Sequence, residues 1–191
     1  MHQPITGTED RLYVELLLLA SMVSAVVATV SQNGKASRFG LSFYALFSSL
    51  VIYGLGEVLS ALFYLITFGI ALAALVAFLE ERFKTIASDG RSSKVTAKLA
   101  FASATAIVFV VVLLVSQELV YAVPASIACM GALTIEKKGL FKTMTGVATL
   151  EGALFVILTR IGFFTILVSV PLCLFMLISG LGLPYALYRR R

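Results

Sequence analysis

Long apolar runs alternate with short polar stretches along the whole chain. The run that organises the rest is residues 58–79, about 22 residues that follow Glu57 and end at the charged group 80–82. At about 1.5 Å per residue, a helix of this length reaches about 33 Å, roughly the thickness of the hydrocarbon core of a bilayer. The pattern therefore predicts an α-helix that spans a membrane.

Other runs predict helices of the same kind. Spans are expected at residues 12–30, 39–53 and 99–116, with a longer final span at 161–188. Thr8 and the acids after it are typical of a helix start, and a tight polar turn is expected at residues 31–38. Because almost no loop separates the second span from the organising helix, the two should form a close antiparallel hairpin.

Two segments are ambiguous. Residues 119–135 are apolar but contain Pro124, and they fit a span, a re-entrant piece or a segment packed at the membrane interface. Residues 143–159 contain Glu151 and fit either an amphipathic lead-in helix or a span. The chain therefore has five spans or seven. We expect an all-α, polytopic membrane domain over residues 1–191, divided into a three-helix front part (12–83), a cytoplasmic loop (84–98) and a back part (99–191).

The cations set the orientation, because positive residues gather on the cytoplasmic side. With five spans and the N-terminus outside, ten cations lie inside and five outside; with seven spans the numbers are thirteen and two. The two arrangements differ in Lys137, Lys138 and Lys142, which lie outside with five spans and inside with seven. In both the N-terminus is outside and the C-terminus is cytoplasmic.

Composition agrees with a membrane location. The chain is 60% hydrophobic and its mean hydropathy is +1.01, more than the surface of a water-soluble domain accommodates. The net charge of +5 does not indicate nucleic acid, because the cations lie between the apolar runs, where topology signals lie. Lipid is the expected surrounding partner. The first run lacks a basic leader and a cleavage site, so no removable signal peptide is expected.

The sequence has no catalytic motif, and we expect neither a metal site nor a cofactor on this chain. Its one histidine is His2, and Cys129 and Cys173 stand alone in apolar runs, which is typical of buried, inert thiols. Acids within apolar runs are the remaining candidates, because they are costly in lipid and often functional. Glu57 and Glu151 are therefore candidate proton-path acids.

Each candidate has a simpler alternative. Glu57 could complement the dipole at the start of its helix, and Glu151 could lie on a wet face at the interface. Gly69 could permit a bend, or could let a neighbouring helix pass close by. Arg160 lies on the opposite helical face from Glu151, so the two are not expected to pair, whereas Arg11 and Glu15 are one turn apart and should form an ion pair.

The front part of the chain resembles the NuoJ-type membrane subunit of respiratory complex I, the family of the mitochondrial sixth ND subunit. In that family the third span carries a motif of the type YVGAVMVLF after an acid. The matching stretch here is residues 67–75, in which Gly69 is kept, Thr67 replaces the tyrosine, and Glu57 precedes the glycine by twelve residues. The five-span layout of the family also fits the chain, so five spans, with Lys137 and Lys138 outside, are the favoured expectation, although the count of cations alone favours seven.

The resemblance implies a non-redox membrane-arm subunit of an NADH:quinone-type oxidoreductase, bound to other membrane-arm subunits in the cell membrane. It implies a π-bulge at Thr67, Phe68 and Gly69, a hinge that couples quinone-linked electron transfer to proton or sodium translocation. The resemblance assigns the subunit no catalysis of its own. The alternatives are a freestanding small transporter or channel, and a structural or assembly membrane protein.

Overall fold

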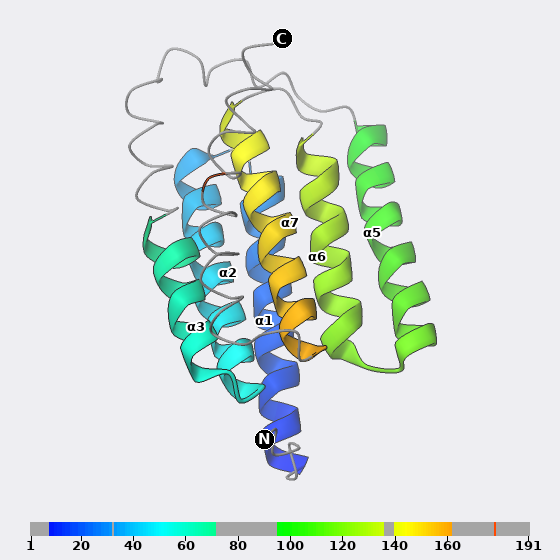
Figure 1. Ribbon diagram of the computed structural model, residues 1–191. Helices are drawn as coiled ribbons and strands as arrows, with labels where there is room; N and C mark the ends of the chain where they lie inside the picture. The colour runs from blue at the N-terminus through cyan, green and yellow to red at the C-terminus, as the bar shows by residue number, and fades with distance from the viewer. Residues whose placement is uncertain (1–7, 32, 72–94, 136–139, 162–177, 179–191) are drawn as a thin grey trace.

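The computed structural model describes residues 8–31, 33–71, 95–135, 140–161 and 178 (Figure 1). Within these residues the chain is all-helical and has no strand, as expected. The helices are α1 (Thr8–Val30), α2 (Gly34–Gly54), α3 (Val58–Tyr64), the π-helix η1 (Leu65–Ala71), α5 (Val95–Ser116), α6 (Leu119–Ile135) and α7 (Leu140–Arg160). The expected loop at 84–94, the rest of the organising helix after Ala71, and nearly all of the final run lie outside the described residues.

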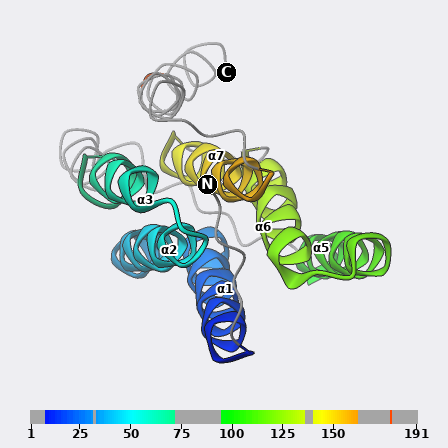
Figure 2. The same cartoon turned by 60° about the horizontal axis from the view of Figure 1, so that its bottom comes forward.

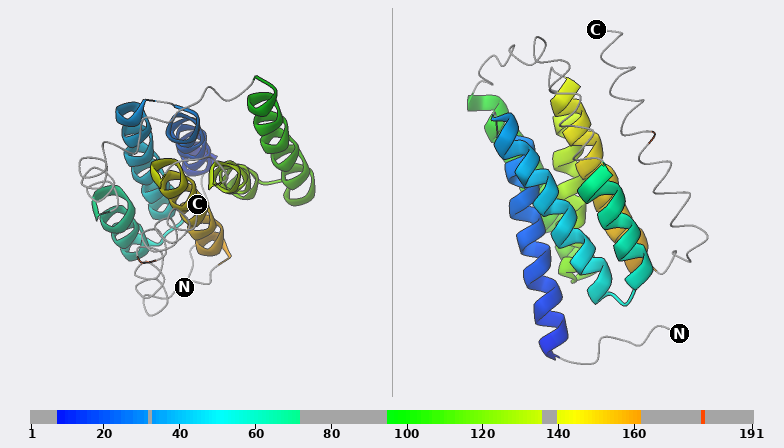
Figure 3. Two further views of the ribbon diagram at one scale, coloured as in Figure 1. Left: turned by 90° about the horizontal axis from the view of Figure 1, so that it is seen from above. Right: turned by 90° about the vertical axis from the view of Figure 1, so that its left-hand side faces the viewer.

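The helices lie side by side and alternate in direction (Figures 1 and 3). We call one end of the bundle the Ser31 end; there α1 meets α2, and α7 begins. We call the other the Arg11 end; there α1 begins, α2 turns into α3, α5 turns into α6, and α7 ends. The expected antiparallel hairpin of α2 and α3 is confirmed, and the Ser49 hydroxyl donates to the Ala61 carbonyl across it at 2.8 Å.

The most extensive helix contacts are between α6 and α7 and between α1 and α2. Figure 2 shows α7 inside the bundle and α5 at its edge, where α5 packs against α6. Glycines mark the closest crossings. A Cβ at Gly131 would lie 2.7 Å from the Gly146 carbonyl oxygen, so α6 and α7 touch through their backbones.

The second helix starts earlier than the sequence pattern predicts. Most of the expected polar turn at residues 31–38 is already the first turn of α2, which begins at Gly34. The cause is local: the Asn33 side chain caps the helix by accepting a hydrogen bond from the Lys35 backbone N–H at 3.0 Å. The first helix begins at Thr8, in agreement with the helix-start residues of the sequence.

Both ambiguous segments are continuous helices packed within the bundle. Pro124 lies inside α6 and is buried, and α7 is largely buried between its neighbours. The burial of α7 favours the interpretation of residues 143–159 as a span over that as a lead-in helix at an interface. Lys142 lies at the Ser31 end, opposite Arg11, whereas the five-span arrangement puts these two residues on one side.

Two of the described helical segments, Arg11–Val30 and Lys142–Arg160, are long and apolar enough to cross a membrane by length and composition. Shorter apolar segments run through α3 and η1, α5 and α6. The bundle has a hydrophobic core, but its outer surface is also apolar and its interior also holds hydroxyl groups. Serine and threonine side chains are buried on six of the helices, while valine, leucine and phenylalanine side chains are exposed along α1, α2 and α5.

Candidate functional site

The turn between α2 and α3 presents Glu57 at the Arg11 end of the bundle. Gly56 has a φ of +92°, a left-handed conformation that favours glycine, and its N–H donates to the Tyr53 carbonyl at 2.9 Å. Glu57 is the N-cap residue of α3, but its side chain forms no capping hydrogen bond to that helix. A carboxylate at this place fits the simpler alternative, in which it complements the helix dipole.

The helix that begins at Val58 changes its winding after Tyr64. Residues Leu65–Ala71 form a π-helix, in which each N–H bonds to the carbonyl five residues earlier. This segment contains Thr67, Phe68 and Gly69, where the family resemblance implied a bulge. Such π segments are rare and occur frequently at functional sites, because the extra residue offsets the helical register that follows.

Close packing does not account for Gly69. A Cβ there would lie 3.0 Å from Leu65 Cδ1, the end of a flexible side chain in the same helix, and 3.8 Å from Ala45 Cβ of α2. Gly40 of α2 gives the contrast, since a Cβ there would lie 2.6 Å from the Ala28 backbone nitrogen of α1. Gly40 is thus required by a neighbouring helix, whereas at Gly69 the described neighbours leave almost enough room for a methyl group.

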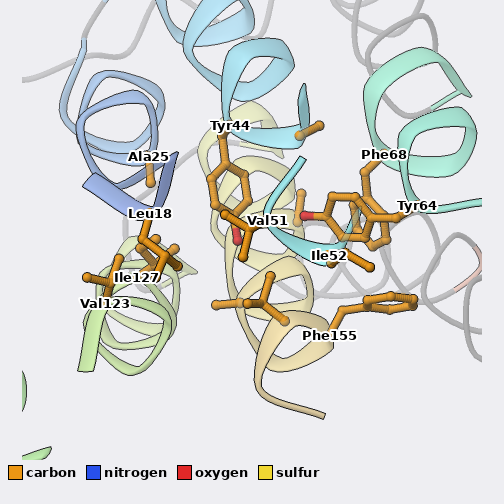
Figure 4. Close-up of a cluster of buried hydrophobic side chains, with 14 of the residues drawn as sticks. Leu18, Ala25, Tyr44, Val51, Ile52, Tyr64, Phe68, Val123, Ile127 and Phe155 are labelled. Carbon is orange, nitrogen blue, oxygen red and sulfur yellow. The ribbon is translucent and has the colours of Figure 1, made fainter. Parts of the chain in front are cut away.

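The π-helix is tied to the centre of the bundle by aromatic contacts. The ring of Phe68 stacks on that of Tyr64, with centroids 4.7 Å apart, and the Tyr64 ring meets Phe155 of α7 at 5.1 Å. All three side chains are buried, as Figure 4 shows. A change of winding in η1 would therefore disturb the contact between α3 and α7.

A cluster of buried hydroxyl groups lies beside this stack. The Tyr44 hydroxyl donates to the Thr149 carbonyl at 3.3 Å, and the side chains of Tyr64 and Ser48 lie close to it. Both tyrosines point toward α7 (Figure 4), where Gly152 leaves them room. A Cβ at Gly152 would lie 2.9 Å from the Tyr44 hydroxyl and would contact the Tyr64 hydroxyl more closely still. We call the residues Tyr44, Ser48, Tyr64 and Thr149, together with the adjacent Gly152, the hydroxyl cluster.

The hydroxyl cluster was not expected from the sequence. The available signal was the presence of two tyrosines within apolar runs, because a buried phenol hydroxyl usually needs a hydrogen-bond partner. The identity of that partner depends on the contact of α2 with α7. Tyr44 and Thr149, which form the hydrogen bond, are 105 positions apart in the sequence.

Glu151 directly precedes Gly152 and lies about halfway along α7. One of its carboxylate oxygens, Oε2, is buried. Glu151 is nine residues before Arg160, so it lies about 14 Å along the helix from the end of α7. Glu57, at the start of α3, lies near that end of α7. The structure does not bring the two candidate acids together.

The described cations differ between the two ends of the bundle. At the Arg11 end, Arg11 pairs with Glu15 at 3.2 Å, as expected, and Arg160 pairs with Glu118 at 3.3 Å. At the Ser31 end, the Lys142 ammonium donates to the carbonyls of Thr29 (3.2 Å), Ala28 (3.4 Å) and Ser31, the last turn of α1. Lys142 is therefore a C-cap that α7 supplies to α1.

Among the residues that the structure describes, no group of three or more histidine, cysteine, aspartate or glutamate side chains could hold a metal ion. Cys129 of α6 is a free thiol and is partly exposed, which differs from the expectation of a buried one. Cys173 lies outside the described residues. No protein-family model, curated protein or solved structure matches the chain.

Proposed function

We propose that the chain is a multi-pass membrane protein that serves as a non-redox membrane-arm subunit of a complex I-like oxidoreductase. In this role it couples quinone-linked electron transfer to proton or sodium translocation through the π-wound segment η1. The proposal joins the family resemblance of the front part to three properties of the bundle: its apolar outer surface, its charge asymmetry and the π-helix.

The membrane location is supported by the exposed faces of α1 and α5. Soluble monomers rarely expose continuous apolar patches of more than a few hundred Å², yet α1 exposes apolar side chains from Leu12 to Val30. Small hydroxyl side chains are buried among the apolar core residues, where they hydrogen-bond to helix carbonyls, as is common between membrane helices. The exposed residues on these two faces are Leu12, Leu16, Leu19, Val23, Val26, Val27, Val30, Ile107, Val110, Val111, Leu114 and Val115.

We propose seven spans, two more than the layout of the family that the front part resembles. Lys142 lies at the Ser31 end together with Lys35 and Arg38, while both described arginines at the Arg11 end are paired with acids. With seven spans the Ser31 end is cytoplasmic, and thirteen cations lie inside against two outside. The N-terminus is then outside and the C-terminus inside.

The π-helix is the observation that carries the coupling role. The described neighbours of Gly69 leave almost enough room for a methyl group, which supports a conformational use: glycine lowers the cost of switching between π and α winding. Such a switch moves Phe68 and its stacking partner Tyr64, whose hydroxyl belongs to the hydroxyl cluster. The resemblance implies that rewinding opens or closes a water path between the quinone site and antiporter-like subunits. Glu57 and Glu151 are candidate acids on such a path.

Purification under mild detergent tests the subunit role. The chain should migrate on native gels in a much larger assembly that contains other polytopic subunits and oxidises a reduced donor with a quinone acceptor. A stable monomer that moves ions by itself after reconstitution would instead establish the freestanding transporter. A monomer that moves no ions and binds no such subunits would leave a structural or assembly role.

A further inference from the structure

The Ser31 end of α2 carries a hollow that the proposed function does not use. It has a volume of about 320 Å³ and is lined by Lys35, Arg38, Phe39 and Ser42. These four residues are spaced three and four positions apart, so they share one face of the first two turns of α2. The hollow therefore combines two cations, a hydroxyl group and an aromatic ring.

Among the described residues, the charges at this end favour an anion. Of the glutamates whose side chains the structure describes, Glu15, Glu57 and Glu118 lie at or near the Arg11 end and Glu151 lies midway along α7. None of them neutralises the hollow. Arg38 already has an interaction within the protein, but a guanidinium group carries five N–H donors and can hold a second partner.

The surface below the hollow is apolar. Phe39, Phe43 and Leu46 are exposed and continue the same face of α2 toward the middle of the bundle, and the ring of Phe43 stacks on Phe47. From Phe39 to Leu46 this face extends about 10 Å along the helix axis. A charged hollow at one end of an apolar strip matches a molecule with an anionic head and a hydrocarbon tail.

We propose that this hollow binds the phosphate headgroup of an anionic phospholipid, whose acyl chain lies along Phe39, Phe43 and Leu46. The inference rests on the membrane location in the proposed function and adds a specific ligand to it. Lys35 and Arg38 bind the phosphodiester, and the hydroxyl of Ser42 is placed to donate to it. A zwitterionic phospholipid carries its own cation and gains less from the same two side chains.

The test uses the full chain in nanodiscs of phosphatidylcholine with a small fraction of phosphatidylglycerol. Native mass spectrometry after partial delipidation gives the ratio of the two lipids that stay bound. One cation near an anionic headgroup raises the affinity for that lipid about fivefold. The two cations of the hollow should therefore enrich phosphatidylglycerol about ten- to thirtyfold over its bulk fraction. The variant Lys35→Gln/Arg38→Gln should lose this enrichment, and Lys35→Gln alone, at an exposed position, should lose about fivefold.

A matched control removes two cations from the other end: Arg11→Gln/Arg160→Gln should keep the enrichment. Inorganic phosphate and deacylated glycerophosphoglycerol should not displace the lipid at equal concentration, because they lack the chain that lies on the apolar face. Displacement by either would assign the hollow to a free phosphate and overturn the proposal. Equal retention of both lipids, or undiminished enrichment in the Lys35→Gln/Arg38→Gln variant, would also overturn it. The assembly assay on native gels is independent of these outcomes.

Discussion

At the residue scale, Gly152 and the two tyrosine hydroxyls depend on one another. Gly152→Ala places a methyl group against both hydroxyls and should lower the free energy of unfolding by about 1–3 kcal/mol. Tyr64→Phe alone should cost at most about 1.5 kcal/mol, because it removes only the buried hydroxyl group and keeps the ring in place. The double variant should lose less than the sum, because the methyl group occupies the space that the Tyr64 hydroxyl leaves.

Reversible unfolding in detergent micelles measures these differences. Tyr13 of α1 is exposed and provides the control, since Tyr13→Phe combined with Gly152→Ala should be additive. Simple additivity for Tyr64→Phe and Gly152→Ala as well would mean that the two groups do not compete for one space.

At the scale of the element, η1 is the segment whose winding should matter. In Gly69→Val the β-branched side chain crowds the preceding turn and restricts the change between π and α winding, while hydrophobicity and membrane insertion stay nearly unchanged. The complex should keep its subunits, and ion pumping per electron should fall more than electron transfer. Leu62→Val provides the matched control, because Leu62 is exposed on α3 and precedes the π segment.

Normal pumping by Gly69→Val in an intact assembly would exclude the hinge. Gly69→Ala distinguishes an effect on helix winding from an effect of side-chain size. The described neighbours would have to move by only a few tenths of an ångström to accommodate the methyl group. It should therefore assemble normally and show a smaller loss of coupling than the valine variant.

The sequence predicted the positions of the described helices well, because the length of an apolar run and the turn between two runs are local properties. It missed the true start of α2, since a single capping side chain, that of Asn33, decides whether polar residues continue a helix. The π winding leaves no periodic signal in seven residues, and it was reached only through a resemblance. The hydroxyl cluster and the contact of Lys142 with α1 depend on which helices become neighbours, and no local pattern encodes that.

At the scale of the whole molecule, the number of spans is the property that most needs measurement. In a background without Cys129 and Cys173, a cysteine in place of Lys138 should react with an impermeant maleimide only from the cytoplasm if the chain has seven spans. Lys35→Cys should react from the same side and Gln117→Cys only from outside. Reaction at position 138 from outside would restore the five-span arrangement.

Lys142 also constrains the order in which the chain can mature during synthesis. The carbonyl of Thr29 precedes its lysine partner by 113 residues, so the end of the first helix emerges from the ribosome long before its cap exists. At about 5–20 residues per second, this interval lasts roughly 6–20 s. Over that time water or lipid headgroups must solvate those carbonyls, and the arrival of α7 then displaces them. Chains stalled before residue 142 should hold their first helix less firmly, which makes this contact a late check on completed insertion.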